Sequence, residues 1–279
     1  VIALAEDGSS AVPLLGGHHG ANTLARRLAE LCKGHAAVTT ASEVRFGFAL
    51  DDPPPGFLLA NPDHMKPATA ALLNGAALAR DGALNPFLSD IATVTPGFSG
   101  VTLHVTEKTI SGSDRDLIYH PKTLVMGIGC ERNATPEEVI ALAERVLRDN
   151  SLAAASLAAI ASIDLKSDEA AIHAAAAHFG VPARFFTADE LKRETPRLKN
   201  PSDIVAKEVG VPGVAEASAL ALAGPASELL VEKTRSTRAT CAIARAPEPL
   251  LNLGGRQRGI VHVVGIGPGT PDWRAAAAR

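Results

Sequence analysis

The sequence predicts an α/β protein, with two small α/β domains of parallel or mixed sheets joined by a middle region rich in proline and glycine. Apolar runs typical of strands alternate with amphipathic helical patterns, which favours helices packed against a largely parallel sheet. Glycine-rich turns follow several of these strands. Only 4% of the residues are aromatic, and the many alanines and glycines allow close packing. The 279 residues fit two compact domains.

The first predicted unit comprises residues 1–48 and reads as strand, loop, helix and strand. An apolar run at 11–15 precedes the loop 16–22, and the leucines of 23–31 fall on one helical face. A second strand is expected at 36–40. This order is half of a parallel α/β layer.

Residues 49–118 are predicted to be a connecting region rather than a self-sufficient domain, because turn-forming Pro, Gly and Asn interrupt them repeatedly. The strongest interruption is DDPPPG at 51–56. One helix is expected over 67–80, and 101–105 alternates enough to be a strand.

Residues 119–246 form the clearest predicted unit, in which strands alternate with capped helices. The predicted strands are 123–128, 157–165, 183–186, 229–231 and 240–244. The predicted helices begin after the caps Thr135, Ser167 and Thr187, with a further helix over 214–222.

Residues 247–279 are predicted to hold a linker, a new strand and a glycine-rich turn. Because the chain begins in what reads as a half-finished strand, without an initiator methionine or a signal peptide, we expect an excerpt of a longer polypeptide.

Charge and cysteine usage exclude several classes of protein. A net charge of -3 gives no general attraction to nucleic acid or acidic membranes. No apolar run reaches the roughly 20 residues that span a bilayer. The three cysteines, Cys32, Cys130 and Cys241, are far apart and lack CxxC or Cys/His metal spacing, which fits a reducing cytoplasm.

The loop at residues 16–22 is the first candidate site. Its glycines, Gly17 among them, let a ligand approach the backbone, and the next helix offers free N–H groups to an anion. His18 and His19 can exchange protons near neutral pH, and Asn22 can cap the helix or hold a ligand. A tight strand-to-helix turn with two solvated imidazoles explains the same residues, and the pattern alone favours it.

Gly127, Gly129 and Cys130 form the second candidate, at the carboxyl end of a strand, where open α/β sheets bind ligands. The third glycine of a dinucleotide fingerprint is missing. Cys130 is expected at a helix N-terminus, which would lower the pKa of its thiol. No paired histidine lies nearby, so close packing explains it better than nucleophilic catalysis does.

Charged residues at the next strand end form the third candidate. Lys166 can hold a carboxylate and Glu169 can act as a general acid or base, although Asp168 and Glu169 also suit the positive end of a helix dipole. Glu216 stands alone among small residues at a helix start, which makes it a further candidate. Lys233 follows a strand and is either a ligand for anions or an edge-strand lysine.

Four ordered segments carry a resemblance to a known family. They are PLLGGHHGAN at 13–22 with VTTA at 38–41, HPK at 120–122 leading to GIGC at 127–130, ASIDLK at 161–166 with Glu169, and GVPGVAEA at 210–217. Together they resemble the cobalt-precorrin-5A hydrolase family of vitamin B12 synthesis. The family's amino-terminal domain normally begins before the point that corresponds to Val1, so a truncated domain is expected at 1–48.

The tail VVGIGPG at 263–269 resembles the opening of tetrapyrrole methyltransferases that use S-adenosylmethionine. Its position suggests a fusion to a precorrin-3B methyltransferase, whose cofactor would contact Gly265, Gly267 and Gly269.

The family resemblance implies hydrolysis of the δ-lactone of a ring-contracted tetrapyrrole, which lets a two-carbon fragment leave as acetaldehyde. Such chemistry needs an activated water, a general acid and cations for the substrate's carboxylates. The residues expected to transfer protons are His18 or His19 with Glu216 and Glu169. The residues expected to contact substrate are Gly17, Asn22, Gly127, Gly129, Cys130, Lys166 and Lys233.

No metal site of the protein and no cofactor of the hydrolase part are expected, because cobalt would arrive inside the substrate. The expected partners are the corrinoid, other enzymes of the pathway and a second copy in a homodimer. A non-hydrolytic corrinoid carrier is the alternative, since the carboxyl-terminal unit also resembles a stand-alone protein that binds or hands on intermediates. A partner domain of the methyltransferase and a purely structural module are further readings, the second weakened by glycine-rich turns at strand ends.

Overall fold

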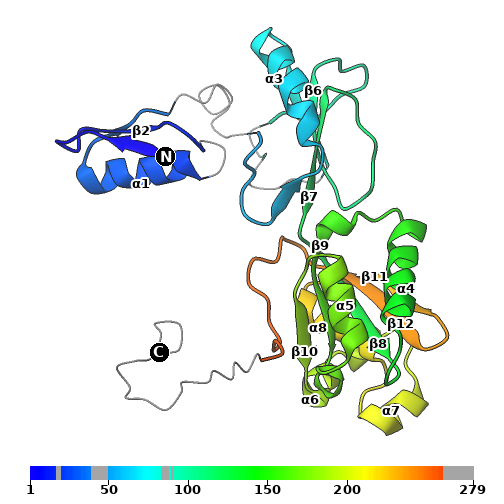
Figure 1. Cartoon of the computed structure of the whole chain (residues 1–279). Coiled ribbons are helices and arrows are strands. Elements are labelled where there is room, and N and C mark those ends of the chain that lie inside the picture. Colours follow the sequence, from blue (N-terminus) through cyan, green and yellow to red (C-terminus); the bar gives the residue numbers. More distant parts are fainter. Residues whose placement is uncertain (17–19, 39–49, 83–87, 89–90, 260–279) are drawn as a thin grey trace, which may run out of the picture.

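The computed structural model describes residues 1–16, 20–38, 50–82, 88 and 91–259. The described elements form three groups, each built around its own sheet (Figure 1). All three groups combine helices with parallel and antiparallel strands, which confirms the predicted α/β class. Among the described residues, no helix is both long and apolar enough to cross a bilayer.

The first group is a small lobe with a single helix on a three-stranded sheet. Its strands are β1 (Ile2–Leu4), β2 (Ser10–Pro13) and β3 (His35–Ala36), and its helix is α1 (Ala21–Cys32). β2 lies in the centre, antiparallel to β1 and parallel to β3. Ala25 and Ala29 of α1 are buried against Ala11 of β2, so only small side chains make this core.

The middle group is a sheet of its own rather than the connecting region that the sequence suggested. Its elements are β4 (Phe57–Leu59), η2 (Pro62–His64), α3 (Met65–Leu73), β5 (Leu78–Gly82), β6 (Val101–Val105) and β7 (Asp116–Pro121). The strand order is β4-β7-β6-β5, with β5, β6 and β7 parallel and β4 antiparallel. Leu72, Leu103, Leu117 and Tyr119 are fully buried between α3 and the sheet. The helix expected over 67–80 was wrong beyond Leu73, because that stretch becomes strand β5.

The carboxyl-terminal group is a five-stranded mixed sheet with the order β10-β9-β8-β12-β11. Its strands are β8 (Leu124–Cys130), β9 (Leu157–Ile163), β10 (Ala183–Phe186), β11 (Glu228–Arg235) and β12 (Ala239–Arg245). β8, β9 and β10 run parallel, whereas β12 is antiparallel to β8 and to β11. The three parallel strands therefore end at one common edge, the carboxyl edge of the sheet.

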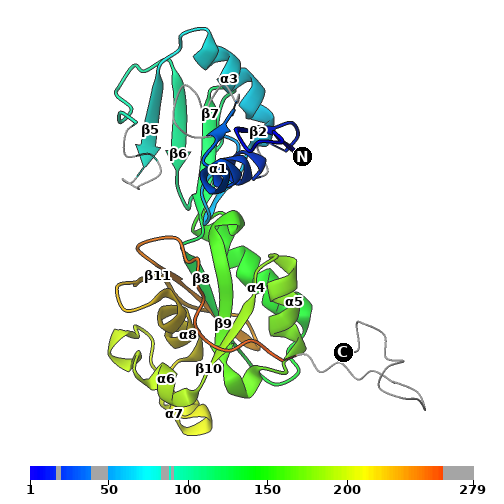
Figure 2. The same cartoon turned by 90° about the vertical axis from the view of Figure 1, so that its left-hand side faces the viewer.

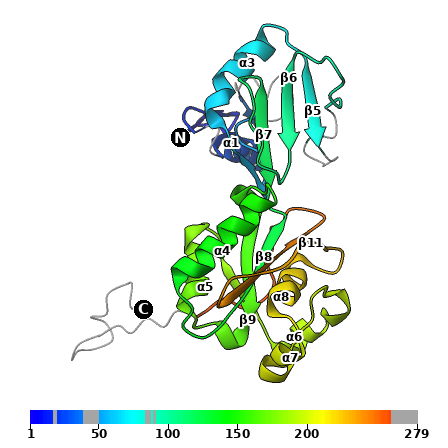
Figure 3. The same cartoon turned by 90° about the vertical axis from the view of Figure 1, so that its right-hand side faces the viewer.

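Helices cover both faces of this sheet, as Figures 2 and 3 show from two sides. α4 (Pro136–Asp149) and α5 (Ala170–His178) pack on one face. α6 (Ala188–Lys192) and α8 (Val214–Ala223) pack on the other, and the short α7 (Asp203–Val209) buries none of its residues. The 3-10 turns are η4 (Ala154–Ser156), η5 (Asp164–Lys166) and η6 (Thr195–Arg197). This three-layer arrangement is typical of α/β domains.

Side-chain caps fix two of these helix starts. Thr135 caps α4 by accepting a hydrogen bond from the Glu138 amide, and Thr187 with Glu190 forms a capping box at α6. The cap expected at Ser167 was wrong: η5 intervenes, and Glu169 is the N-cap residue of α5.

The segment after β12 packs on the sheet instead of running free as a linker. Arg256 exchanges two backbone hydrogen bonds with Phe185 of β10, both 2.8 Å long. Leu250 donates its amide to the carbonyl of Lys122 at 2.9 Å, and the Lys122 amide donates to Gly56 at 2.7 Å. This segment thus helps to join the carboxyl-terminal sheet to the middle group.

Candidate functional site

The carboxyl edge of β8, β9 and β10 brings together several side chains that the sequence singled out. Cys130 ends β8, and Lys166 lies in η5 directly after β9. Glu169, buried at 5% exposure, caps the next helix. Binding crevices of open α/β sheets lie at this edge, so the predicted placement of these three residues is confirmed.

Arg132, which the sequence analysis missed, organises this edge. Its guanidinium contacts Asp168 Oδ1 at 2.5 Å and Glu169 Oε2 at 3.5 Å, and it also donates to the carbonyl of Leu165. The second Glu169 oxygen accepts the amide of Asn133 at 2.9 Å. Both oxygens of Glu169 therefore already have donors, so the side chain anchors this loop.

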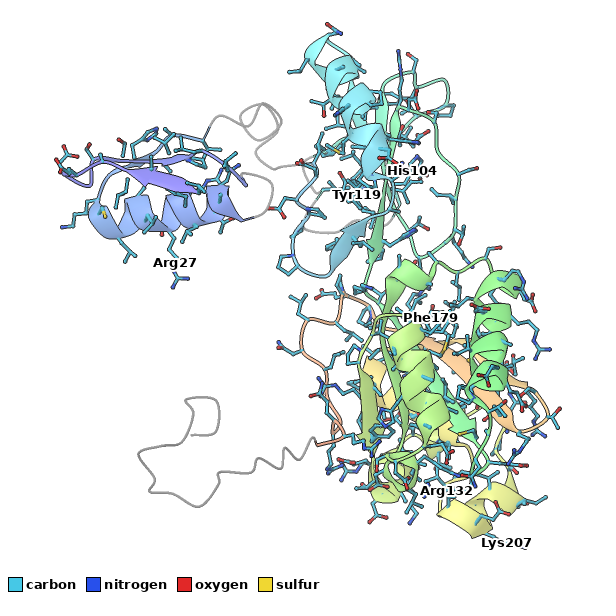
Figure 4. The ribbon with its side chains drawn as sticks, viewed as in Figure 1. Arg27, His104, Tyr119, Arg132, Phe179 and Lys207 are labelled. Atoms are coloured by element: carbon cyan, nitrogen blue, oxygen red, sulfur yellow. The ribbon has the colours of Figure 1, made fainter. Side chains whose placement is uncertain are left out.

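A second guanidinium, that of Arg238 in the β11–β12 hairpin, reaches the same loop. It donates to Glu131 Oε2 at 3.0 Å and to the carbonyls of Asn133 and Arg132 at 3.0 and 2.7 Å. Figure 4 shows Arg132 at the end of the unit that also carries Lys207 of α7. No spacing rule links Arg238 to Glu131 in the sequence, so only the fold reveals this contact.

The lowered thiol pKa expected for Cys130 was wrong. Burial raises the pKa of Cys130 to about 11, and the negative charge of Glu169 adds to that rise, while Lys166, Arg132 and Arg238 only partly oppose it. α4 begins only at Pro136, so Cys130 does not lie at a helix N-terminus. A thiol in this state is a poor nucleophile at neutral pH.

Glu216 is fully buried in the first turn of α8, where it accepts four hydrogen bonds. Oε2 accepts the amides of Lys199 and Asn200 at 2.8 and 3.0 Å. Oε1 accepts the amide of Lys233 at 2.9 Å and the Asn200 side chain at 3.0 Å. Burial on its own would raise the pKa of Glu216, but these hydrogen bonds outweigh it and hold that pKa below 4.5. The carboxylate thus ties the 199–200 turn and β11 to α8, and its predicted role in proton transfer is untested.

The two predicted lysines differ in their surroundings. The ammonium of Lys233 donates to the carbonyl of Asn200, and burial lowers its pKa. Lys166 is half-buried, and the described residues give its ammonium neither a hydrogen bond nor an ion pair. Lys166 is therefore the better placed of the two to accept an anion from solvent.

The glycines of β8 are required by packing. A Cβ atom at Gly127 would lie 1.8 Å from the carbonyl oxygen of Ala215 in α8. A Cβ atom at Gly129 would lie 2.8 Å from the hydroxyl of Thr240 in β12. Glycine suits both positions because neighbouring elements approach so closely that a Cβ atom would collide with them. The expected contact of Gly127 and Gly129 with substrate stays a prediction.

The remaining predicted residues lie elsewhere. Asn22 is buried in the first turn of α1, whose N-cap position is Gly20 without a side-chain hydrogen bond, so the capping interpretation of Asn22 was wrong. Gly17, His18 and His19 lie outside the described residues, as do the three tail glycines at 265, 267 and 269. Within the described part of the chain, no group of three or more His, Cys, Asp or Glu side chains could hold a metal ion.

The fold and this edge define an α/β protein whose carboxyl edge is braced by ion pairs between arginines and carboxylates. Two family models match the chain: Cobalamin synthesis G C-terminus over residues 124–244, and Cobalamin synthesis G N-terminal over residues 1–43. The chain is 51% identical to Protein CobE of a Sinorhizobium species over 121 residues, which cover 43% of this chain and 79% of that protein. The chain belongs to the cobalamin synthesis G family, and its pathway is cobalamin biosynthesis.

Two further likenesses extend the comparison. The chain is 26% identical over 270 residues to a Cobalt-precorrin-5A hydrolase of Priestia megaterium, covering 88% of this chain and 71% of that protein. The crystal structure of CobE, a protein from the cobalamin (vitamin B12) biosynthetic pathway, is 39% identical and matches 45% of this chain and 92% of its own with a TM-score of 0.43. The family models stop at residue 244, so the methyltransferase expected in the tail stays a prediction.

Proposed function

We propose that this chain hydrolyses the δ-lactone of cobalt-precorrin-5A with release of acetaldehyde. The observation that carries the proposal is the match to the Priestia megaterium hydrolase, which extends over 88% of the chain and so includes the lobe, the middle sheet and the carboxyl-terminal sheet. A carrier built from the carboxyl-terminal sheet alone would not need the other two groups.

The chemistry divides between two parts of the chain. Water adds to the lactone carbonyl carbon and the ring C–O bond breaks, which leaves a carboxylic acid on the macrocycle and an alcohol whose oxygen has gained a proton. The two-carbon fragment that carries this alcohol then leaves as acetaldehyde: its O–H proton is lost as the C=O bond forms, the C–C bond to the macrocycle breaks, and the macrocycle carbon keeps the electron pair and takes up a proton. His18 or His19 is the proposed proton carrier, because an imidazole titrates near neutral pH, whereas the described carboxylates Glu169 and Glu216 are both occupied by donors. Lys166 is proposed to bind a carboxylate of the substrate, which also brings the cobalt.

The test is incubation of the protein with cobalt-precorrin-5A and detection of acetaldehyde. We expect acetaldehyde from the wild type, slower turnover in His18→Ala, and a raised KM in Lys166→Met. Tight binding of the substrate without acetaldehyde would reject hydrolysis.

A corrinoid-binding partner is the second candidate. The chain is similar to Protein CobE over 121 residues, and Glu169 and Glu216, whose oxygens already accept hydrogen bonds, suit a rigid binding surface better than proton transfer. Binding of cobalt-precorrin-5A without turnover is the outcome that would favour this candidate.

We also propose that the tail residues Gly265, Gly267 and Gly269 open a precorrin-3B methyltransferase that binds S-adenosylmethionine. Their support is the strand-and-turn pattern of VVGIGPG. The proposed setting is the cytoplasm, as a homodimer in contact with other corrin-pathway enzymes. Calorimetry with S-adenosylmethionine tests the tail, and absence of binding by the longest available polypeptide would reject it.

A further inference from the structure

A groove separates the middle group from the carboxyl-terminal sheet, and the sequence analysis did not foresee it. Its volume is about 750 Å³, within the range of small-molecule sites. Leu58 and Thr109 of the middle group face the ends of α4 and α5 across it. The lining residues are Leu58, Thr109, Lys122, Glu144, Leu147, Arg148, Ser151, Leu152, Ala154, Ala155, His178 and Phe179.

This groove lies at the end of the sheet opposite to the carboxyl edge. Lys122 precedes β8, and the helix end at Arg148 returns to the start of the parallel strands. Figure 4 shows Phe179 beside the middle group and Arg132 at the far end of the same unit. β8 spans seven residues between the two sites, a length of about 20 Å, so one ligand group cannot occupy both.

The walls of the groove are largely apolar, and its charged side chains are the cationic Lys122 and Arg148 and the acidic Glu144. Leu58 is 46% exposed, and Leu152 and Phe179 face the same space. Lys122 is half-buried, and its ammonium donates to the carbonyl of Leu157 at 3.0 Å. A lysine has three N–H donors, so two directions remain open to a ligand.

Nearby acidic side chains leave the lining of the groove with more positive than negative charge. The one carboxylate of the lining, Glu144, is held by His178 at 2.8 Å. Arg148 lies 4.0 Å from Asp149, and both side chains are well exposed, so their attraction is weak. An apolar surface with Lys122 and Arg148 at its border complements a ligand that is apolar in its body and carries carboxylates at its edge.

The second cavity of the described residues gives a useful contrast. It measures about 340 Å³, lies in the amino-terminal lobe, and is lined by Val1, Ile2, Leu15, Gly16, Gly20, Ala21, Leu24 and Leu28. None of these side chains is charged, so none of them can form an ion pair with a carboxylate.

We propose that the groove between the middle group and the carboxyl-terminal sheet is a second corrinoid site, which binds a polycarboxylated tetrapyrrole by its apolar face and its carboxylates. The inference rests on the proposed function, because the macrocycles of that reaction carry carboxylate side chains. A molecule held here stays away from Lys166 at the carboxyl edge, as a product or intermediate awaiting transfer would.

Uroporphyrin III, an octacarboxylate macrocycle, is the probe, and its fluorescence on titration with the full chain reports binding. We expect Arg148→Glu to weaken Kd by about three- to tenfold and Leu58→Asp by about tenfold. The matched control is Lys66→Glu, a charge reversal on exposed α3, which should bind as the wild type does. Circular dichroism checks that each variant is folded, and both substituted groove residues are partly exposed.

Unchanged Kd in both groove variants, or no uroporphyrin binding by the wild type, would overturn the inference. Loss of all binding in Lys166→Glu would also overturn it, because binding would then belong to the carboxyl edge. Acetaldehyde release from cobalt-precorrin-5A is measured separately: its absence from the wild type rejects hydrolysis, whereas the uroporphyrin titration still decides the groove.

Discussion

Replacing Glu216 with glutamine should destabilise the carboxyl-terminal sheet by about 3 kcal/mol. Each carboxylate oxygen accepts two N–H groups, so whichever way the amide turns, its NH₂ group faces two donors. Hydrogen bonds to a charged group contribute about 1.5–3 kcal/mol each, and the lower end applies because the 199–200 turn can relax. A loss of this size lowers Tm by roughly 10 °C.

The assay is thermal unfolding followed by circular dichroism, with Glu208→Gln on exposed α7 as the matched control. The pH dependence provides a second reading. Because the folded pKa of Glu216 lies below 4.5, its contribution to stability is complete above about pH 4.5 and is lost as the pH falls through the folded pKa. The gap in Tm between wild type and Glu216→Gln should therefore narrow in acid. A Tm shift under about 2 °C at pH 7 would refute the anchoring role.

Three other outcomes follow from the packing and the charges. The ion pair with Arg256 and the capping bonds lower the pKa of Glu190 to about 2. Glu190→Gln should therefore cost about 1 kcal/mol at pH 7 after solvent screening, and this cost should shrink as the pH falls from about 4.5 through 2, as measured by urea unfolding. Gly127→Ala should cost about 3 kcal/mol in the same assay, because its Cβ would meet the α8 backbone. The control Gly254→Ala should cost under about 0.5 kcal/mol, because no atom lies within 4 Å of the Cβ that it would add. Equal costs for the two variants would contradict the packing described for Gly127. Iodoacetamide at pH 8 should alkylate exposed Cys32 well before Cys130, whose thiol pKa is about 11, and peptide mass spectrometry showing the reverse order would contradict that value.

The carboxyl-terminal sheet was predictable because its signals are local. Thr135 with Pro136 and Thr187 with Glu190 cap helices through contacts within a few residues, and the structure shows both caps. The order of strand and helix then follows from the short connections of an α/β layer.

The strand predicted at 101–105 is confirmed as β6, but the sheet around it was missed, because its neighbours β5 and β7 carry polar residues where a strand pattern needs apolar ones. His104 of β6 contacts Asp81 of β5 at 3.1 Å and Asp116 of β7 at 2.9 Å, so polar side chains of three strands satisfy one another. Such pairs depend on strands that meet only in the fold. The prolines and glycines between the strands were therefore interpreted as a sign of a connecting region.

The sequence predicted which residues lie at the candidate site better than it predicted what those residues do. Lys166, Glu169 and Cys130 meet at the carboxyl edge as the strand ends indicated. The partners that saturate Glu169 and Glu216 come from distant loops, including backbone amides that no residue type reveals. Burial and neighbouring charge, which decide the pKa of Cys130, are likewise properties of the fold.

The most direct test of the proposed hydrolysis is the reaction of cobalt-precorrin-5A in water enriched in oxygen-18. Attack of water on the lactone carbonyl predicts one acetaldehyde released per macrocycle and one oxygen-18 atom in the carboxylate that the macrocycle gains, both measured by mass spectrometry. A macrocycle that binds but is recovered unlabelled, with no acetaldehyde, would contradict hydrolysis and leave this chain a corrinoid-binding protein.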